Sequence, residues 1–199
     1  MSNIKQKQYL TIKDYLSQEL TNEIKHEYVN GQTYAMADAS VNHGRISENV
    51  FGELLNHLKK STCEPFMSDM KVKTSTGNYR YPDVLVVCDN DFIDNKYATK
   101  TPVILVEVLS RSTRKTDEKD KLLEYINIPS LKEYVIIEQD IVDITVYRKT
   151  DNWRSTHYFM GETIKFESIN LTLAVEDIYY RVENKDVIDF MIEKNQNVT

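Results

Sequence analysis

The sequence lacks any long apolar run. No segment approaches the roughly 20 consecutive apolar residues that a membrane-spanning helix needs. The first residues, Met-Ser-Asn-Ile-Lys-Gln-Lys-Gln, also contain no apolar core of signal-peptide length. These two absences predict a cytoplasmic protein that does not associate with membranes.

Cysteine is scarce, since Cys63 and Cys88 are the only two in a chain of 199 residues. Cys88 ends an apolar segment of the kind that forms a buried strand, which favours a packing role for it. We therefore expect both thiols to be reduced and structural.

The chain has no excess of positive charge. It carries 25 Lys and Arg residues against 31 Asp and Glu residues, a net charge of −6. This balance argues against a protein that coats nucleic acid through bulk electrostatics, although it is compatible with a local basic cleft. Linkers, internal repeats and low-complexity segments are missing as well. Their absence predicts a single domain over residues 1–199, with a core at about 11–180 and a frayed tail at about 195–199.

The patterns that are present alternate between strand and helix, which is typical of an α/β fold. A short helix is expected at 11–18, and Asn30-Gly31 between alternating residues at 26–36 predicts a hairpin. Apolar residues then recur every four positions from 42 to 60, which predicts a helix with Asn42 as its N-cap. The stripe consists of Ile46, Val50, Leu54 and Leu58.

Strand patterns dominate the rest of the chain. They occur at 66–74, 83–88 and 103–110, with a polar connector at 89–101. A helix is expected from about 114 to 127, followed by strands at 133–138 and 141–148. The alternation continues through 153–175 and predicts an additional C-terminal β-meander, before a peripheral helix at 185–194.

Two carboxylates lie within apolar strands, Asp83 at the start of one and Glu107 deep in the next. An ionised carboxylate in such a place is costly unless a cation, a hydrogen-bond donor or a metal accompanies it. If the two strands pair antiparallel, a register centred on Asn95 places these carboxylates opposite each other. The same register places Leu85 opposite Leu105 and Val87 opposite Val103.

Residues directly opposite in such a pair have Cβ atoms roughly 5 Å apart. Two like charges at that separation repel unless a cation lies between them. A hard divalent ion with oxygen ligands, Mg²⁺ or Mn²⁺, would satisfy Asp83 and Glu107 and could activate water towards a phosphoryl group. The alternative is structural: Asp83 caps a turn, and Glu107 pairs with a buried lysine or arginine.

Chemistry of this kind also needs a cation that orients water or stabilises developing charge. Leu109 shares a face with Glu107 but is apolar, so the cation must come from elsewhere. Asp117, Lys121 and Tyr125 repeat every four residues on the expected helix, which makes Lys121 the candidate. The alternative for Lys121 is an ordinary surface pair with Asp117. The competing donors are Arg114, Lys115 and Lys119.

These residues resemble the Uma-type restriction endonucleases, a bacterial branch of the PD-(D/E)XK nuclease superfamily. The resemblance extends over most of the chain, from about residue 11 to 180. Its central motifs are Pro82-Asp83, Glu107-Val108-Leu109-Ser110, Ser112-Thr113, and Asp117 with Lys121 and Tyr125. Its outer motifs are Glu27-Tyr28 with Gly31 and Met36, His43, and Leu131 with Glu133-Tyr134.

The resemblance implies a restriction-endonuclease-like core, a mixed β-sheet flanked by helices, and Mg²⁺-dependent hydrolysis of phosphodiester bonds. Asp83 and Glu107 would be the metal ligands, with the carbonyl of Val108 assisting. Lys121 would be the catalytic cation, because Leu109 stands where the superfamily normally has its lysine. Accessory roles would fall to Glu27, His43, Asp117 and Tyr125. For His43, a capping or supporting hydrogen bond is the alternative.

The implied partner is nucleic acid, with DNA favoured over RNA. Cutting both strands with one active site per chain would favour a homodimer. The competing function is a binding or regulatory module that keeps the nuclease fold without turnover. The acidic net charge and the missing motif lysine both favour that alternative.

Overall fold

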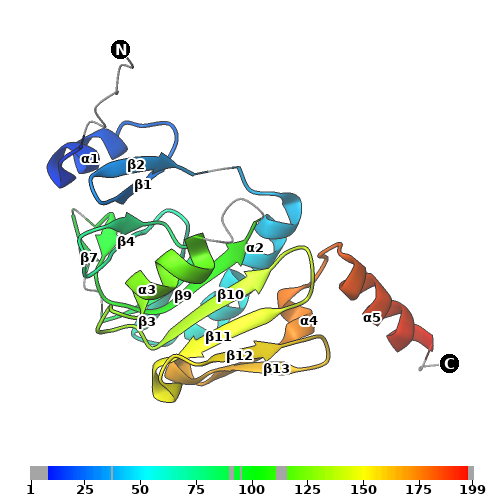
Figure 1. The fold of residues 1–199 in the computed structure, drawn as a ribbon. Helices are drawn as coiled ribbons and strands as arrows, with labels where there is room; N and C mark the ends of the chain where they lie inside the picture. The colour runs from blue at the N-terminus through cyan, green and yellow to red at the C-terminus, as the bar shows by residue number, and fades with distance from the viewer. Residues whose placement is uncertain (1–8, 37, 90–91, 95, 111–115, 197–199) are drawn as a thin grey trace, which may run out of the picture.

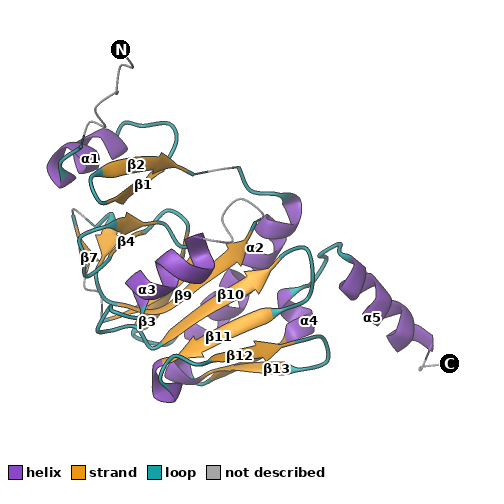
Figure 2. Ribbon diagram, in the orientation of Figure 1, coloured by secondary structure: helices purple, strands orange, loops and turns teal. Residues whose placement is uncertain are grey.

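The computed structural model has a mixed α/β fold with helices on both faces of a central sheet (Figures 1 and 2). It describes residues 9–36, 38–89, 92–94, 96–110 and 116–196, apart from the side chains of Thr116 and Asp117. The fold class expected from the sequence is confirmed.

The central sheet contains six described strands in the order β12-β11-β10-β9-β6-β3. Neighbouring strands are antiparallel except for β9 and β10, which run parallel, so the sheet is mixed. The consecutive strands β10, β11 and β12 form a meander, and β13 pairs with β14 beside it. The strands are β3 (Cys63–Met67), β6 (Val84–Cys88), β9 (Pro102–Leu109), β10 (Glu133–Glu138), β11 (Ile144–Arg148), β12 (Ser155–Tyr158), β13 (Thr163–Phe166) and β14 (Leu171–Ala174).

A second sheet is built from the N-terminal hairpin and short strands, in the order β2-β1-β5-β4-β8-β7. The hairpin confirms its sequence signal, because Asn30 and Gly31 have φ values of 49° and 82°, as a type I′ turn requires. The strands are β1 (His26–Val29), β2 (Gln32–Ala35), β4 (Lys71–Lys73), β5 (Tyr79–Arg80), β7 (Phe92–Ile93) and β8 (Ala98–Thr99).

Two of the expected segments are divided differently. The single strand expected at 66–74 is wrong, because the chain turns after Met67, whose carbonyl accepts the N–H groups of Asp69 and Met70. The residues before this turn join the central sheet as β3, and those after it join the second sheet as β4. The connector at 89–101 is likewise not all loop, since it contains β7 and β8.

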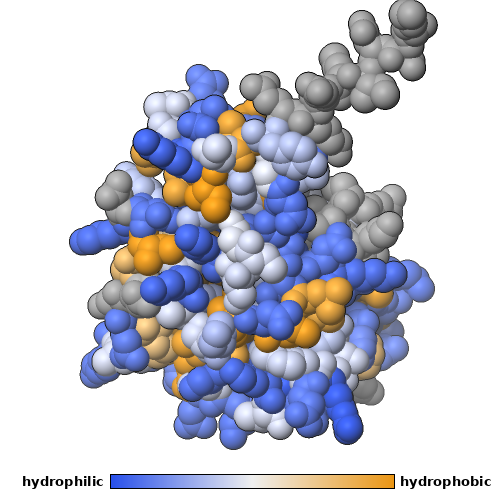
Figure 3. All heavy atoms as spheres, turned by 60° about the vertical axis from the view of Figure 1, so that its left-hand side comes forward, coloured by the Kyte–Doolittle hydropathy of each residue, from blue (hydrophilic) through white to orange (hydrophobic). Residues whose placement is uncertain are grey.

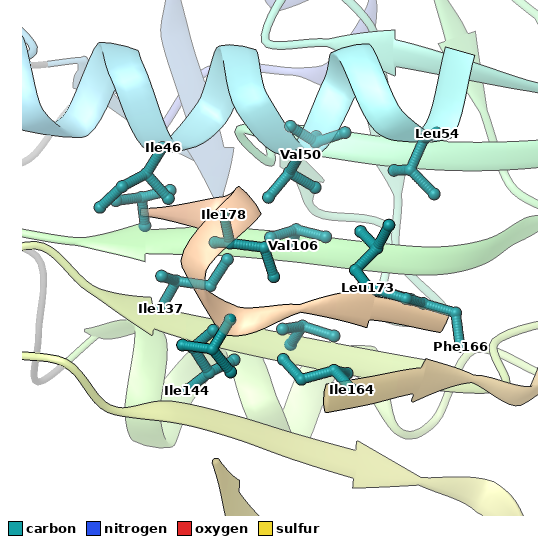
Figure 4. Close-up of a cluster of buried hydrophobic side chains, with 14 of the residues drawn as sticks. Ile46, Val50, Leu54, Val106, Ile137, Ile144, Ile164, Phe166, Leu173 and Ile178 are labelled. Carbon is teal, nitrogen blue, oxygen red and sulfur yellow. The ribbon is translucent and has the colours of Figure 1, made fainter. Parts of the chain in front are cut away.

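Helix α2 (Val41–Leu58) covers one face of the central sheet. Its N-cap is Ser40, whose Oγ accepts the N–H of His43, so the expectation of Asn42 as the cap is wrong. The side chain of Asn42 instead bonds the backbone of Glu183. The predicted stripe is buried against the sheet (Figure 4), in a cluster that includes Ile46, Val50, Leu54, Leu58, Val106, Val108, Val135, Ile137 and Ile144.

The opposite face is covered by the helix that follows β9. Its described part begins as a π-helix at Thr116–Lys121 and continues as α3 (Leu122–Tyr125). The expected helix is therefore confirmed only in part, and its first described turn is wider than an α-turn. Under it lies a second cluster that includes Leu105, Leu109, Tyr125, Tyr134 and Ile136. Alternate residues of β9 therefore face two different apolar layers.

The register between β6 and β9 begins as expected, with Leu85 opposite Leu105 and Val84 opposite Val106. The expected pairing of Val87 with Val103 is wrong. An irregularity after Val86 shifts the ladder, so Val87 lies opposite Pro102.

The two cysteines contradict the expectation of reduced thiols. Cys63 and Cys88 lie opposite each other in the β3–β6 pair and are joined by a disulfide. Periodicity places Cys88 on a strand but does not indicate which strand pairs with it, so the sequence pattern does not predict the bond.

The remaining described α-helices are α1 (Ile12–Glu19), α4 (Val175–Ile178) and α5 (Lys185–Gln196). Helix α4 contributes Val175 and Ile178 to the core, whereas α5 lies at the periphery. No helix in the described ranges is long and apolar enough to cross a membrane. The face shown in Figure 3 is mostly hydrophilic, with separate small apolar patches.

Candidate active site

Asp83 lies at the bend immediately before β6, next to the end of β9. Its Oδ2 accepts the backbone N–H of Val108 at 2.7 Å, and Nε2 of His43 lies 3.2 Å from the same oxygen. The first contact fixes the carboxylate one residue from Glu107. The second is possible because the Ser40 cap starts α2 close to the start of β6, where His43 reaches Asp83.

Glu107 is 3% exposed, and it lies on the α3 face of β9 between Leu105 and Leu109. Its Oε1 accepts hydrogen bonds from the Lys121 ammonium at 3.0 Å and from the Tyr125 hydroxyl at 2.9 Å. Both donors come from the helix above the sheet, and they compensate a carboxylate whose burial would otherwise be costly. Burial, and then the charge of Glu107, raise the pKa of Tyr125 well above its ordinary value, so its hydroxyl stays a donor.

Glu27 on β1 brings a third carboxylate to the same place. Its Oε1 lies 3.3 Å from Lys121 and accepts the N–H of Tyr81 at 3.2 Å, while its Oε2 lies 2.8 Å from Arg80. Burial by itself would raise the pKa of Glu27. The positive charges of Lys121 and Arg80 outweigh burial and hold that pKa below its ordinary value.

Arg80 is the participant that the sequence did not reveal. It is 4% exposed, lies on β5, and binds Glu124 of α3 through Nε at 3.1 Å and Nη2 at 2.7 Å. Residues 75–80 have the composition of a turn, in which an arginine is ordinarily solvated. In the sequence, its role in the site is indicated only by its position three residues before Asp83.

The predicted site residues fall into two groups. Asp83, His43 and the N–H of Val108 form the first, and Glu107, Lys121, Tyr125 and Glu27 form the second. Adjacency of Glu107 and Val108 in β9 joins the two groups. The side chain of Asp117 lies outside the described residues, as do Arg114 and Lys115, whereas Lys119 is exposed.

The helix stripe expected from the sequence holds in its second half. Lys121 and Tyr125 are one α-turn apart and reach the same oxygen of Glu107. The π-helical turn before Lys121 breaks the four-residue spacing towards Asp117.

The chemistry of these residues suits a hard divalent ion. Asp83 and Glu107 offer carboxylate oxygens on neighbouring chain segments, and oxygen is the donor that Mg²⁺ and Mn²⁺ prefer. Among the described side chains no group of three or more His, Cys, Asp or Glu residues is arranged to hold a metal. An ion at this place would therefore rely on two carboxylates, supplemented by a backbone oxygen and water.

The alternative for the two acids also has support, because Glu107 does pair with a buried lysine. The structure therefore shows the acids, the lysine and their geometry. The metal and catalytic roles of Asp83, Glu107, Val108 and Lys121 are proposals, and so are the accessory roles.

Comparison with known proteins identifies relatives. Two uncharacterized proteins of Synechocystis sp. are similar to this chain, one 37% identical over 85% of this chain and 91% of the relative, the other 34% identical over 79% and 92%. The fold is similar to the crystal structure of a putative nuclease from Anabaena variabilis, with a TM-score of 0.68. That similarity covers 82% of this chain and 96% of the nuclease at 16% sequence identity, which establishes the shared fold.

A family model also matches residues 12–176, nearly the range over which the motifs resemble the Uma-type enzymes. The match includes every residue of the two groups around Asp83 and Glu107. The chain belongs to the Uma2 family, described as putative restriction endonucleases.

Proposed function

We propose that this protein is a DNA endonuclease that hydrolyses phosphodiester bonds with the help of a carboxylate-bound divalent cation. One observation carries the proposal: Asp83 is fixed by the N–H of Val108, directly beside Glu107, and Glu107 in turn contacts Lys121. Membership of a restriction endonuclease family and a nuclease-like fold support an enzyme of the endonuclease kind.

Asp83 and Glu107 would hold the Mg²⁺ or Mn²⁺ ion, with the carbonyl of Val108 as a third oxygen. When bound, such an ion supplies an activated water and neutralises charge on the phosphoryl group. Lys121 provides a fixed positive charge next to Glu107, where it can orient water or stabilise the developing charge. His43 and Tyr125 orient the two carboxylates through their contacts with Asp83 and Glu107.

The missing motif lysine has a structural account under this proposal. Leu109, at the superfamily position, is 1% exposed and belongs to the apolar layer that contains Tyr125. A lysine there would bring a charge into this buried apolar layer. The helix above supplies the ammonium from Lys121 instead.

Nucleic acid would be the partner, with DNA favoured by the family description. A homodimer would place two such sites on the two strands of a duplex. It predicts a solution mass twice the 23.3 kDa of the chain, measurable by light scattering.

A binding module without turnover is the second candidate. The observation that favours it is the pairing of Glu107 with Lys121 and Tyr125, which compensates the carboxylate without any ion. The two candidates differ in whether DNA is cut.

The test is cleavage of supercoiled plasmid with Mg²⁺, compared between the wild-type protein and Asp83→Ala. We expect the wild type to cut and chelation by EDTA to stop it. Asp83→Ala should lose cleavage. Glu64→Ala should keep it, because Glu64 is exposed on the edge strand β3, opposite Val87, at the end of β6 away from Asp83. Cleavage that persists in pure Asp83→Ala protein would remove the assignment, and folded wild type that never cuts would favour the binding module.

A further inference from the structure

Arg80 joins three parts of the fold at one guanidinium. It extends from β5, its Nη1 binds Glu27 of β1 at 2.8 Å, and its Nε and Nη2 bind both oxygens of Glu124 of α3. Its side chain is only 5% exposed. A planar guanidinium can make this two-sided fork, whereas a lysine ammonium acts as a point charge without that geometry.

Both acidic partners of Arg80 constrain the position of Lys121. Glu27 contacts the Lys121 ammonium at 3.3 Å through Oε1, the oxygen that Arg80 leaves unused. Glu124 lies three residues after Lys121 on the same helix, so its pair with Arg80 fixes the height of that helix over β9. Arg80 thus constrains Lys121 both through the carboxylate beside it and through the helix that carries it.

The backbone next to Arg80 adds a third constraint. The N–H of Tyr81 donates to Glu27 at 3.2 Å, and two residues later the chain reaches Asp83. The segment from Arg80 to Asp83 therefore connects the Glu27–Lys121 contact to the carboxylate at the start of β6.

We propose that Arg80 is a positioning residue for the nuclease reaction: by holding Glu27 and Glu124 it sets where the Lys121 ammonium lies relative to Glu107. The inference rests on the proposed function. It differs from a general stabilising role because it ties Arg80 to the geometry of Lys121, and displacement of a catalytic group by about 1 Å is enough to lower kcat about 100-fold.

The kinetic test uses Arg80→Lys, which keeps the charge and removes the fork. We expect kcat for plasmid cleavage to fall about 100-fold with KM unchanged. The matched control is Arg148→Lys, because Arg148 is 8% exposed, lies near Glu133 and is remote in sequence from the site residues. The control should lose stability but keep its kcat. Equal losses of kcat in both variants, or an unchanged kcat in Arg80→Lys, would overturn the inference.

A second variant, Glu124→Gln, does not depend on the folding of Arg80→Lys. A second measurement, a crystal structure, does not depend on activity. Glu124→Gln keeps Arg80 but removes the charge and one of the two acceptor oxygens of its partner, and kcat should fall by a smaller factor. In crystal structures of both variants, the Lys121–Glu107 distance of 3.0 Å should lengthen beyond hydrogen-bond range. Retention of that distance would contradict the inference. A wild type that binds DNA without cutting would refute the proposed function, while the crystallographic result would still decide the role of Arg80.

Discussion

Lys121 is the residue on which the proposed chemistry depends most. Its ammonium contacts Glu107 at 3.0 Å and Glu27 at 3.3 Å, and its side chain is only 8% exposed. A buried cation of this kind acts in a setting where electrostatic interactions are stronger than in water. The choice of Lys121 over its neighbours can be tested within one helix.

Lys121→Met should lower kcat by about 100- to 1000-fold, because a fixed charge next to the reacting phosphate is lost. It should also cost about 3 kcal/mol of stability, since the buried carboxylate of Glu107 loses its charged partner. Lys119→Met is the matched control: Lys119 is exposed two residues earlier, and its loss should at most raise KM. Cleavage rates and thermal unfolding separate the two effects, and equal loss of kcat in both variants would argue against Lys121.

Glu27 should make stability depend on pH. Its pKa is below the ordinary 4.5 in the folded protein, so the unfolded chain binds the proton more readily. The stabilisation is therefore complete above about pH 4.5 and is lost as pH falls through the lowered pKa of the folded state. Glu27→Gln should be less stable at pH 7 and should lose less stability on acidification. Parallel urea-unfolding profiles for the two proteins from pH 7 to pH 3 would contradict this.

At the scale of single residues, the sequence indicates the two acids but not all the residues that surround them. Asp83 and Glu107 were identifiable because a charge inside an apolar strand requires a partner. Lys121 followed from its spacing to Tyr125 on the next helix. Arg80 could not be identified, because its three contacts exist only after β1, β5 and α3 meet in space.

At the scale of elements, local patterns were informative where one segment suffices. The Asn30-Gly31 hairpin and the apolar stripe of α2 follow from turn geometry and helical spacing. The division of 66–74 between two sheets and the π-helical turn before Lys121 do not, because both depend on tertiary contacts. The pairing of Val87 with Pro102 likewise depends on tertiary contacts.

The disulfide between β3 and β6 offers a test of pairing in the sheet. Its cysteines are 25 residues apart, and closing a loop of about that length stabilises a protein by about 3 kcal/mol. Reduction, or Cys63→Ser, should lower the free energy of unfolding by that amount. Ellman titration of the denatured protein should find no free thiol before reduction and two after it. Two alkylated cysteines in protein alkylated during lysis, detected by mass spectrometry, would contradict the bond, because only reduced thiols are alkylated.

At the scale of the whole molecule, the site lies where the two sheets meet. Glu27 and Arg80 come from the second sheet, Glu107 from the central sheet, and Lys121 from the helix between them. The similarity to the Anabaena variabilis nuclease at a TM-score of 0.68 shows that this arrangement of layers is shared despite 16% identity. Fold class followed from the alternation of patterns, whereas the meeting of the sheets depends on long-range contacts that periodicity does not encode.

The proposed function depends above all on Asp83 and Glu107 holding one divalent cation together. Titration of Mn²⁺ into the DNA-free protein by isothermal calorimetry tests it most directly, with Asp83→Asn, Glu107→Gln and the control Glu64→Ala measured alongside. We expect one saturable site in the wild type and in Glu64→Ala, and its loss in each of the two site variants. No binding by the wild type, or equal binding by all four proteins, would contradict the account.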